Sequence, residues 1–352
     1  MPPNPSRQPA GSPRPSPGKV DIRQVAEESG VSTATVSRVM NRRSLVAEST
    51  RLRVLQVADR LHYVPTASAR SLRNNATMVI GVLVPDLANP VFVPFLRGVQ
   101  RVAQAHGYAV LVVDAQRSAK VERRAVDVLH AQQVAALVLA GSPRDPVRIE
   151  QLRRDGLLVV DASGEIGSAP ALVPDLEEPG IWAMCDALAE LEHRRIGYVS
   201  RTRAHGEAGR RRWAALSSRC RQLGLSAERV ILGSSPDITR SSRVLTSVIE
   251  RPDPVTALVC ATHGLAPTVL RALRAADVDL PGDCSFVTFG DSEWAAAFRP
   301  TISAVSLDLY SAASLMTTRV LGVLTGSGAG FDEQPAPARF LPRESSGPPP
   351  AP

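Results

Sequence analysis

IRQVAEESGVSTATVSRVMN, residues 22–41, has the pattern of two short helices around a tight turn. Val25 and Ala26 fall on one face of the first helix, and Val36 and Val39 recur three residues apart beyond the turn. Each helix therefore has an apolar face, and the two faces can share a core. This stretch predicts a helical hairpin near the start of the chain.

The residues between the two helices predict a reversal of the chain. Gly30 stands where a left-handed backbone conformation is least costly for glycine. Ser32 follows as the expected N-cap of the second helix, where its hydroxyl accepts from backbone N–H groups. The residues after the cap are small and polar, so this helix is thin enough for a major groove about 12 Å wide. The pattern predicts a helix-turn-helix motif, which binds DNA, and an ordinary hairpin of a globular core is the alternative.

The excess positive charge lies at the same end of the chain. The 352 residues include 41 Lys and Arg against 34 Asp and Glu, a formal net charge of +7. Residues 1–76 have 12 basic and 5 acidic side chains, so residues 77–352 have 29 of each and are neutral. Localised positive charge is the pattern expected of phosphate binding, whereas a solubilising charge would be spread over the surface.

A third helix is expected from about Glu48 to Leu61, which would complete a three-helix head. Pro65 then ends helical structure, because the residue before a proline is pushed towards extended geometry. Four apolar side chains of the third helix are expected to face the hairpin: Leu52, Leu55, Val57 and Ala58.

From Met78 onward the pattern changes to short apolar runs that alternate with amphipathic stretches. Strict alternation of strands and helices predicts a doubly wound α/β architecture, in which ligands bind beyond the carboxyl ends of the strands. Runs on both sides of about Gly180 predict two such lobes with a cleft between them. The runs expected to form parallel strands are residues 78–84, 109–115, 135–141, 157–163, 195–201, 257–262 and 285–291.

These patterns divide the chain into five expected parts. The parts are a disordered N-terminal tail (1–19), a helix-turn-helix domain (20–64), a linker (65–76), a two-lobed body (77–329) and a disordered Pro- and Ser-rich C-terminal tail (330–352). The N-lobe is expected to comprise about 77–179 plus 306–329, and the C-lobe about 180–305.

Composition excludes several classes of protein. The chain has no run of 18 apolar residues that could span a membrane, and its Pro- and Ser-rich start predicts a disordered leader rather than a signal peptide. We therefore expect a cytoplasmic protein, associated with the nucleoid when it is bound to DNA. Neither the histidines nor the cysteines have metal-ligand spacing, so no metal and no cofactor are expected. The cysteines, expected to be reduced, are Cys185, Cys220, Cys260 and Cys284.

The head, the short linker and the two-lobed α/β body together resemble the LacI/GalR (lactose-repressor) family of bacterial transcription regulators. The resemblance covers residues 20 to about 325 and is strongest in VDIRQVAEESGVSTATVSRVMN and in YVPTASARSLRNNATMVIGVLVPDLANPVF. Weaker matches, among them EHRRIGYVS and RPTISAV, follow in the family's order. The implied fold is a small all-α head plus a two-lobed, doubly wound parallel-sheet body like the type I periplasmic binding proteins.

The resemblance implies where the head would touch DNA. In the family the start of the second helix reads bases in the major groove, and the matching residues here are Thr33, Ala34 and Arg38. Arg38 is the best equipped for guanine, through bidentate donation to O6 and N7. Phosphate contacts are implied for Ser32, Thr35, Ser37 and Asn41.

The resemblance also implies a second contact through the linker. In relatives the linker folds into a hinge helix on DNA and inserts a leucine into the minor groove, which kinks the duplex. Leu72 takes that position, with Ala69 and Arg70 beside it, and packing of Leu72 on the body is the alternative. Thr66 replaces the family's usual asparagine.

The effector site of the body is matched less well. Relatives that sense sugars use an arginine in an R-x-x-G-aromatic context, which Arg212 fits best, although Ala215 and Leu216 replace the glycine and the aromatic residue. His263 is expected to be either a polar ligand contact or a surface histidine at a helix start. The residues that match effector positions are Asp86, Asn89, Phe92, Asp161, Arg212, Thr262, His263 and Asp291.

The departures from the family pattern concern groups that bind ring hydroxyls. The family's usual Ala-Asn-Asp is Ala261-Thr262-His263 here, its Phe-Asp-Asp is Phe289-Gly290-Asp291, and Leu307 replaces a frequent glutamine. A site built to bind hydroxyls depends steeply on such carboxylates and carboxamides. We therefore expect an effector other than a common sugar, or none.

The resemblance implies a sequence-specific DNA-binding transcription regulator. We expect a repressor that binds a pseudo-palindromic operator as a homodimer, with control by a small molecule between the lobes. A soluble small-molecule receptor with a vestigial head is the alternative. An enzyme on the same fold is a third hypothesis, but the sequence lacks a nucleophile elbow, a phosphate loop and a paired acid and base.

Overall fold

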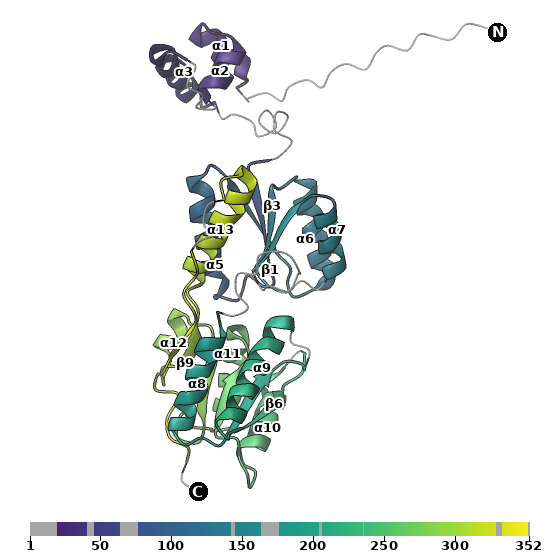
Figure 1. Ribbon diagram of the computed structural model, residues 1–352, viewed down its shortest axis with the longest axis vertical. Coiled ribbons are helices and arrows are strands. Elements are labelled where there is room, and N and C mark those ends of the chain that lie inside the picture. Colours follow the sequence, from purple (N-terminus) through teal and green to yellow (C-terminus); the bar gives the residue numbers. More distant parts are fainter. Residues whose placement is uncertain are drawn as a thin grey trace, which may run out of the picture. The chain divides into compact units, whose positions relative to one another are not determined.

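The computed structural model describes residues 20–40, 46–63, 77–141, 145–162, 176–203, 206–234, 236–328 and 333–350. They belong to two compact units, 1–75 and 76–352, called here the head and the body (Figure 1). Each unit has its own hydrophobic core.

The head is a bundle of three helices, α1 (Ile22–Ser29), α2 (Thr33–Met40) and α3 (Glu48–Arg60). One small cluster of aliphatic side chains holds it together, and Val25, Val36 and Val54 contribute one fully buried valine from each helix. The prediction that Leu52 faces the hairpin is wrong, because Leu52 is 50 % exposed and Val54 occupies the core instead. Residues two positions apart in a helix point about 200° apart around its axis. A prediction that is wrong by two positions therefore exchanges the buried and the exposed face.

The N-lobe of the body has a parallel sheet of strand order β2-β1-β3-β4. Helices α5 and α13 pack on one face of the sheet, and α6 and α7 pack on the other (Figure 1). Its elements are β1 (Val79–Val84), α5 (Phe92–Ala105), β2 (Ala109–Asp114), α6 (Ala119–Ala131), β3 (Ala136–Leu139), α7 (Pro146–Arg154), β4 (Leu158–Asp161) and α13 (Leu309–Thr325).

Helix α13 comes late in the chain but packs in the N-lobe, because α5 has a glycine where the two helices touch. A Cβ atom at Gly98 would lie 2.4 Å from the carbonyl oxygen of Tyr310, so the two helices can approach this closely only at a glycine. The buried side chains Ala313 and Met316 of α13 then complete the core that β1 and α5 begin.

The C-lobe has a six-stranded sheet of order β10-β9-β8-β7-β5-β6, parallel except for β10. Helices α8 and α9 cover one face of the sheet, and α10 and α11 cover the other. Its elements are α8 (Glu178–Glu190), β5 (Arg195–Ser200), α9 (Gly206–Gln222), β6 (Ser226–Ile231), α10 (Ile238–Ile249), β7 (Ala257–Cys260), the 3-10 turn η1 (His263–Leu265), α11 (Ala266–Arg274), β8 (Ser285–Phe289), α12 (Glu293–Ala297), β9 (Ser303–Ser306) and β10 (Arg339–Leu341).

The predicted α/β fold class is correct, but three strands of the C-lobe have no counterpart among the runs expected from the sequence. Strand β6 lies at the edge of the sheet and includes Ser226, Glu228 and Arg229, a polar composition that suits an edge. Strands β9 and β10 have only four and three residues, too few to show a clear alternation.

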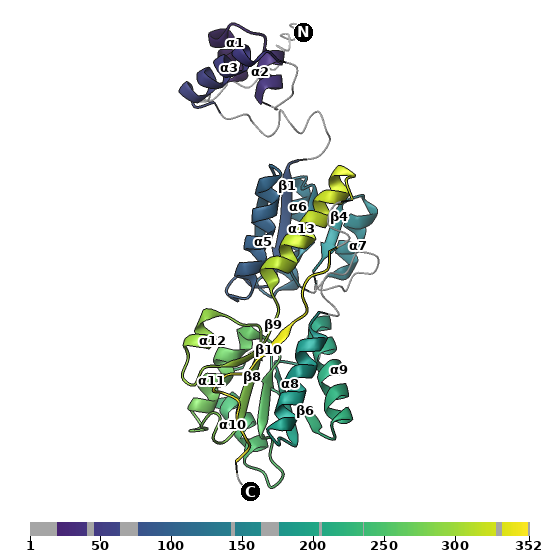
Figure 2. The same ribbon diagram turned by 60° about the vertical axis from the view of Figure 1, so that its left-hand side comes forward.

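The expected disorder of the C-terminal tail is wrong for residues 333–350. After α13 the chain returns to the C-lobe, where β10 pairs antiparallel with β9, with Phe340 opposite Val305 (Figure 2). Beyond β10, Ser345 is fully buried and exchanges backbone hydrogen bonds with Thr301 and Phe286. Pro and Ser are typical of disordered segments, yet here each buried polar group of Ser345 has a partner in the sheet.

His193 ties this C-terminal segment to the sheet. Its ring is fully buried, with Nδ1 2.9 Å from the Thr256 hydroxyl and Nε2 3.0 Å from both the Ser285 hydroxyl and the Gly347 carbonyl oxygen. Burial lowers the pKa of His193 below its ordinary value of 6.5, and the Gly347 carbonyl offsets this only in part.

The body should therefore lose stability as the pH falls below about 6.5. Because the pKa of His193 is lower in the folded than in the unfolded state, the unfolded state binds more protons in this range, and stability is complete only above the unfolded value. The slope should reach at most about 1.4 kcal/mol per pH unit for this group. His263, whose pKa burial also lowers, contributes in the same direction.

We expect His193→Gln to reduce the fall in the melting temperature between pH 7.5 and pH 5.5. Differential scanning calorimetry of the full chain measures it, with His106→Gln, a change at an exposed histidine of α5's C-terminal end, as the matched control. An equally steep fall in His193→Gln and the wild type would contradict this account.

Candidate DNA-binding face and effector site

The turn between α1 and α2 has the geometry that the sequence predicts. Gly30 is in the left-handed region with φ of 64°, and nothing lies within 4 Å of the position of a Cβ, so its backbone conformation alone favours glycine. Ser32 caps α2, since its hydroxyl oxygen accepts from the Thr35 backbone N–H at 3.2 Å and lies 3.0 Å from the Thr35 hydroxyl.

Helix α2 has one buried and one exposed side. Val36 and Val39 are buried in the head core, whereas Thr33, Ala34 and Arg38 are exposed. Among the described residues, Arg38 has no hydrogen bond or ion pair, so its guanidinium is available to a ligand. This is the face that the sequence assigns to base reading.

The remaining residues assigned to DNA divide into two groups. Ser32 is exposed, and Thr35 and Ser37 are partly exposed beside the same face. The others lie outside the described residues: Asn41, Ala69, Arg70 and Leu72.

In the body, four sequence-assigned effector residues lie on the N-lobe. Asp86 follows β1 and accepts from Arg117 Nε at 2.7 Å, and Asn89 lies in the next turn, only 8 % exposed. Phe92 begins α5 and packs against the lobe's core. Asp161 ends β4 and is 1 % exposed.

The two lobes contact each other at these strand ends. A Cβ at Gly264, after β7, would lie 3.1 Å from Arg117 Nη2 and 3.4 Å from Asn89 Cγ. A Cβ at Gly290, after β8, would lie 3.1 Å from Val91 Cγ2. The structure therefore brings Asp86 and Asn89 together with the loop that contains Thr262 and His263.

All three guanidinium nitrogens of Arg212 donate hydrogen bonds inside the C-lobe. Its Nε donates to Glu177 Oε2 at 2.7 Å, its Nη2 donates to Oε1 at 2.5 Å, and its Nη1 donates to the Ala261 carbonyl oxygen at 2.9 Å. The guanidinium also stacks over the Phe289 ring, 4.7 Å from its centroid. Burial alone would lower the pKa of Arg212, but the Glu177 carboxylate more than offsets this, so the net pKa is raised.

Asp291 is paired in the same way, with a residue of the C-terminal segment. Arg343 Nη1 and Nη2 donate to its two carboxylate oxygens, both at 2.8 Å, and Nη1 also donates to the Ile302 carbonyl oxygen at 2.7 Å. A bidentate pair of this geometry leaves the carboxylate little capacity for a ligand.

His263 is not the surface histidine that the sequence allowed. It is 2 % exposed, its Nε2 lies 2.8 Å from the Ser292 hydroxyl, and its ring lies 4.8 Å from that of Trp294. Burial lowers its pKa, with only partial compensation from Gly290 and Asp291, so the ring is neutral at neutral pH. Next to it, the Thr262 hydroxyl is buried without a hydrogen-bond partner among the described residues.

Four charged residues of this region were missed from the sequence: Arg117, Glu177, Arg201 and Arg343. The rule that ligand groups follow the carboxyl ends of parallel strands could have found Arg117, after β2, and Arg201, directly after β5. Arg343 could not be found, because its segment was expected to be disordered.

The two units of the chain match two known families. The family described as "Bacterial regulatory proteins, lacI family" matches residues 21–66, and the family described as "Periplasmic binding protein-like domain" matches residues 185–346. Among the part of the chain that is described, no helix is long and apolar enough to cross a membrane.

Relatives resemble the chain over most of its length. Catabolite control protein A of Streptococcus mutans is 29 % identical over 309 residues, which cover 86 % of this chain and 91 % of that protein. The HTH-type transcriptional regulator GalR of Escherichia coli is 26 % identical over 83 % of this chain and 86 % of its own length.

Solved structures share the fold. The Lac repressor bound to ONPG in its repressed state gives a TM-score of 0.77 at 22 % identity and covers 94 % of this chain and 100 % of that one. The Lac repressor dimer bound to operator and the anti-inducer ONPF gives 0.73 at 23 % identity, covering 93 % and 99 %.

A helix-turn-helix head that precedes a body of two parallel α/β lobes defines a class of DNA-binding transcription regulators, not of enzymes. Within that class, the chain belongs to the LacI/GalR family of bacterial regulatory proteins. The family and the general function predicted from the sequence are thereby confirmed.

Proposed function

We propose that the chain is a repressor that binds a pseudo-palindromic operator as a homodimer and responds to a small molecule at the contact between its lobes. It would act in the cytoplasm, at the nucleoid when bound to DNA. The observation that carries the proposal is the face of α2, where Thr33, Ala34 and Arg38 are exposed above buried valines. The first turns of such a helix fit the major groove, and an unpaired arginine can donate to guanine.

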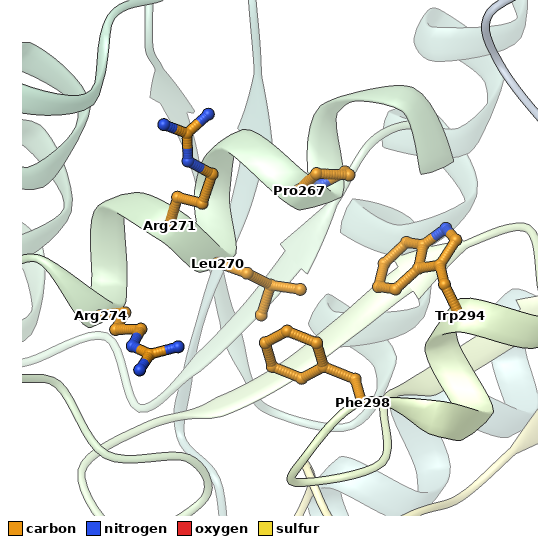
Figure 3. A pocket seen from close by; sticks show the side chains of 6 residues that line it. All are labelled: Pro267, Leu270, Arg271, Arg274, Trp294 and Phe298. Atoms are coloured by element: carbon orange, nitrogen blue, oxygen red, sulfur yellow. The ribbon is translucent and has the colours of Figure 1, made fainter.

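Dimerisation has a candidate surface on the C-lobe. Helices α11 and α12 enclose a hollow of about 340 Å³ whose walls are mostly apolar (Figure 3). Arg271 and Arg274 lie at its rim. Glu293, the exposed first residue of α12, directly precedes the lining residue Trp294. The apolar residues that line the hollow are Pro267, Leu270, Trp294 and Phe298.

A second copy of the chain fits this surface better than an unrelated partner. A two-fold interface brings one patch against itself, so the patch must be self-complementary, and this one has an apolar centre with charges of both signs at its rim. Two-fold symmetry would also present two α2 helices to two half-sites of one operator.

Control by a ligand follows from the contact between the lobes. A ligand that binds one arrangement of the lobes more tightly than another shifts the population between them, and the dimer interface and the linker can transmit that shift. Thr66, Ala69, Arg70 and Leu72 of the linker, together with Asn41 of the head, remain sequence-based assignments in this scheme.

Arg38→Ala should reduce the preference for operator over random DNA. Loss of a bidentate guanine contact costs about 1–3 kcal/mol, roughly a tenfold to hundredfold change in the ratio of the two affinities. The operator is first selected from a random DNA library with the purified chain, and fluorescence anisotropy then measures both affinities. Arg23→Ala, an 86 % exposed arginine side chain on α1, is the control and should keep the ratio. A library that yields no enriched palindrome would overturn the proposed function.

Leu72→Ala should lower the bend of the bound operator, because an apolar wedge that unstacks a base step produces the kink. Energy transfer between dyes at the two operator ends reports the bend, and Leu52→Ala, at an exposed leucine of α3, is the control. An unchanged bend would remove Leu72 from the minor groove.

Pro267→Asp should convert the dimer to a monomer. The change puts a charge at the apolar hollow, but an acidic residue in the first turn of α11 agrees with the helix dipole, so folding is preserved. Val147→Asp is a close control, because Val147 is also the second residue of a helix, α7, and is 74 % exposed. Analytical ultracentrifugation measures the association state, and a Pro267→Asp variant that still dimerises at micromolar concentration would exclude this face.

A further inference from the structure

Two arginines from different lobes meet where the strand ends of the body come together. Arg117 follows β2 of the N-lobe, and its Nη2 lies 3.1 Å from the position that a Cβ of Gly264 in the C-lobe would take. Arg201 directly follows β5 of the C-lobe. Strands β5 and β7 pair with Val199 opposite Cys260, so Arg201 lies beside the loop from Thr262 to Gly264.

This group has buried polar atoms without partners. Arg201 Nε and Thr262 Oγ1 are both inaccessible to solvent and have no hydrogen bond among the described residues. Buried donors are almost always paired, because an unpaired donor loses its bonds to water without replacement. Two such atoms on adjacent strand ends indicate a site that is completed by something other than the chain.

The contact between the lobes also has more positive than negative charge, with Arg117 and Arg201 beside the single carboxylate of Asp86. Asp86 accepts from Arg117 Nε at 2.7 Å, and it is the carboxylate that interacts with both guanidinium groups. Burial lowers the pKa of Arg201, and repulsion by Arg117 lowers it further, with only partial compensation from Asp86. Elsewhere in the body the chain balances such charges, as in the pairs of Arg212 with Glu177 and Arg343 with Asp291.

The backbone at Arg117 is also unusual. Gln116 and Arg117 have φ values of 49° and 54°, in the left-handed region that side chains with a Cβ seldom occupy. The Arg117 N–H donates to the Pro85 carbonyl oxygen at 2.8 Å, which holds this turn against the end of β1. Strained backbone of this kind occurs at ligand sites, where it fixes a side chain in position.

We propose that Arg117, Arg201 and Thr262 form an oxyanion site, which binds the phosphate or carboxylate group of the small molecule that controls this regulator. The inference rests on the proposed function, because it names the ligand class of the contact between the lobes. An oxyanion would accept from both guanidinium groups and from the threonine hydroxyl, and it would supply the missing negative charge. Since Arg117 belongs to one lobe and Arg201 to the other, the anion also favours the arrangement in which the lobes touch.

The test uses the full chain and four defined probes: glucose 6-phosphate, inorganic phosphate, succinate and glucose. Thermal shift and isothermal titration calorimetry should show saturable binding of one or more of the three anions, and none of glucose. A response to glucose 6-phosphate and phosphate identifies a phosphate group, and a response to succinate identifies a carboxylate. Binding of glucose alone, or of no anion at millimolar concentration, overturns the proposal.

Variants separate the site from general attraction of anions. Arg201→Gln and Arg117→Gln should each weaken anion binding on the order of tenfold to a hundredfold, because each removes a charge-assisted contact. Arg243→Gln, at an exposed position of α10, should leave it unchanged. Equal losses in all three variants would mean non-specific attraction and would also overturn the proposal.

A second measurement needs no ligand. Arg201→Met removes a partly buried cation whose buried Nε has no hydrogen bond among the described residues, so the free protein should melt about 2–4 °C higher while losing the anion response. A lower melting temperature would show that Arg201 is a structural residue. Operator binding by Arg201→Met without ligand is measured in parallel, so that failure of the anion site is distinguished from failure of the DNA-binding proposal.

Discussion

The attachment of the C-terminal segment to the C-lobe depends on the pair between Arg343 and Asp291. This pair fastens the last described segment of the chain to the loop after β8, through two hydrogen bonds of 2.8 Å. Ser345 and Gly347 then continue the attachment along β8 and β9, and β10 covers what would otherwise be an open sheet edge. Because α13 precedes this segment and lies in the N-lobe, the same attachment brings the chain back across the junction of the lobes.

That attachment also decides which groups face a ligand. The family pattern places a carboxylate at Asp291, but Arg343 occupies both of its oxygens. In the same way, Glu177 forms an ion pair with Arg212, the cation that the resemblance assigns to an effector. With these two groups paired inside the C-lobe, the buried polar atoms at these strand ends that lack a partner among the described residues are Arg201 Nε, Thr262 Oγ1 and His263 Nδ1.

Most of the fold could be predicted from the sequence, because it depends on periodicity that is local. The hairpin, the cap at Ser32, the left-handed Gly30 and the alternation of strands and helices all follow from neighbours within a few residues. Strand β10 and the buried Ser345 could not be predicted, because their stability comes from partners more than 30 residues away, and β9, which pairs with both β8 and β10, has only four residues. The same limit applies to the site, since the partners of Arg212 and Asp291 lie 35 and 52 residues away in the chain.

Pairing of charges therefore separates structural from ligand-binding residues better than position in the family pattern. An arginine that donates to a carboxylate and to a carbonyl oxygen, as Arg212 does, already has its hydrogen bonds and stabilises the fold. An arginine that is partly buried beside a second arginine, as Arg201 is, is retained at a cost in stability. The same criterion applies to the head, where Arg60 is paired with Glu28 while Arg38 on α2 has no partner among the residues that the structure describes. Arg38 and Arg201 thus lie where each unit is proposed to meet an anion, the DNA backbone and bases in the head and an oxyanion ligand in the body.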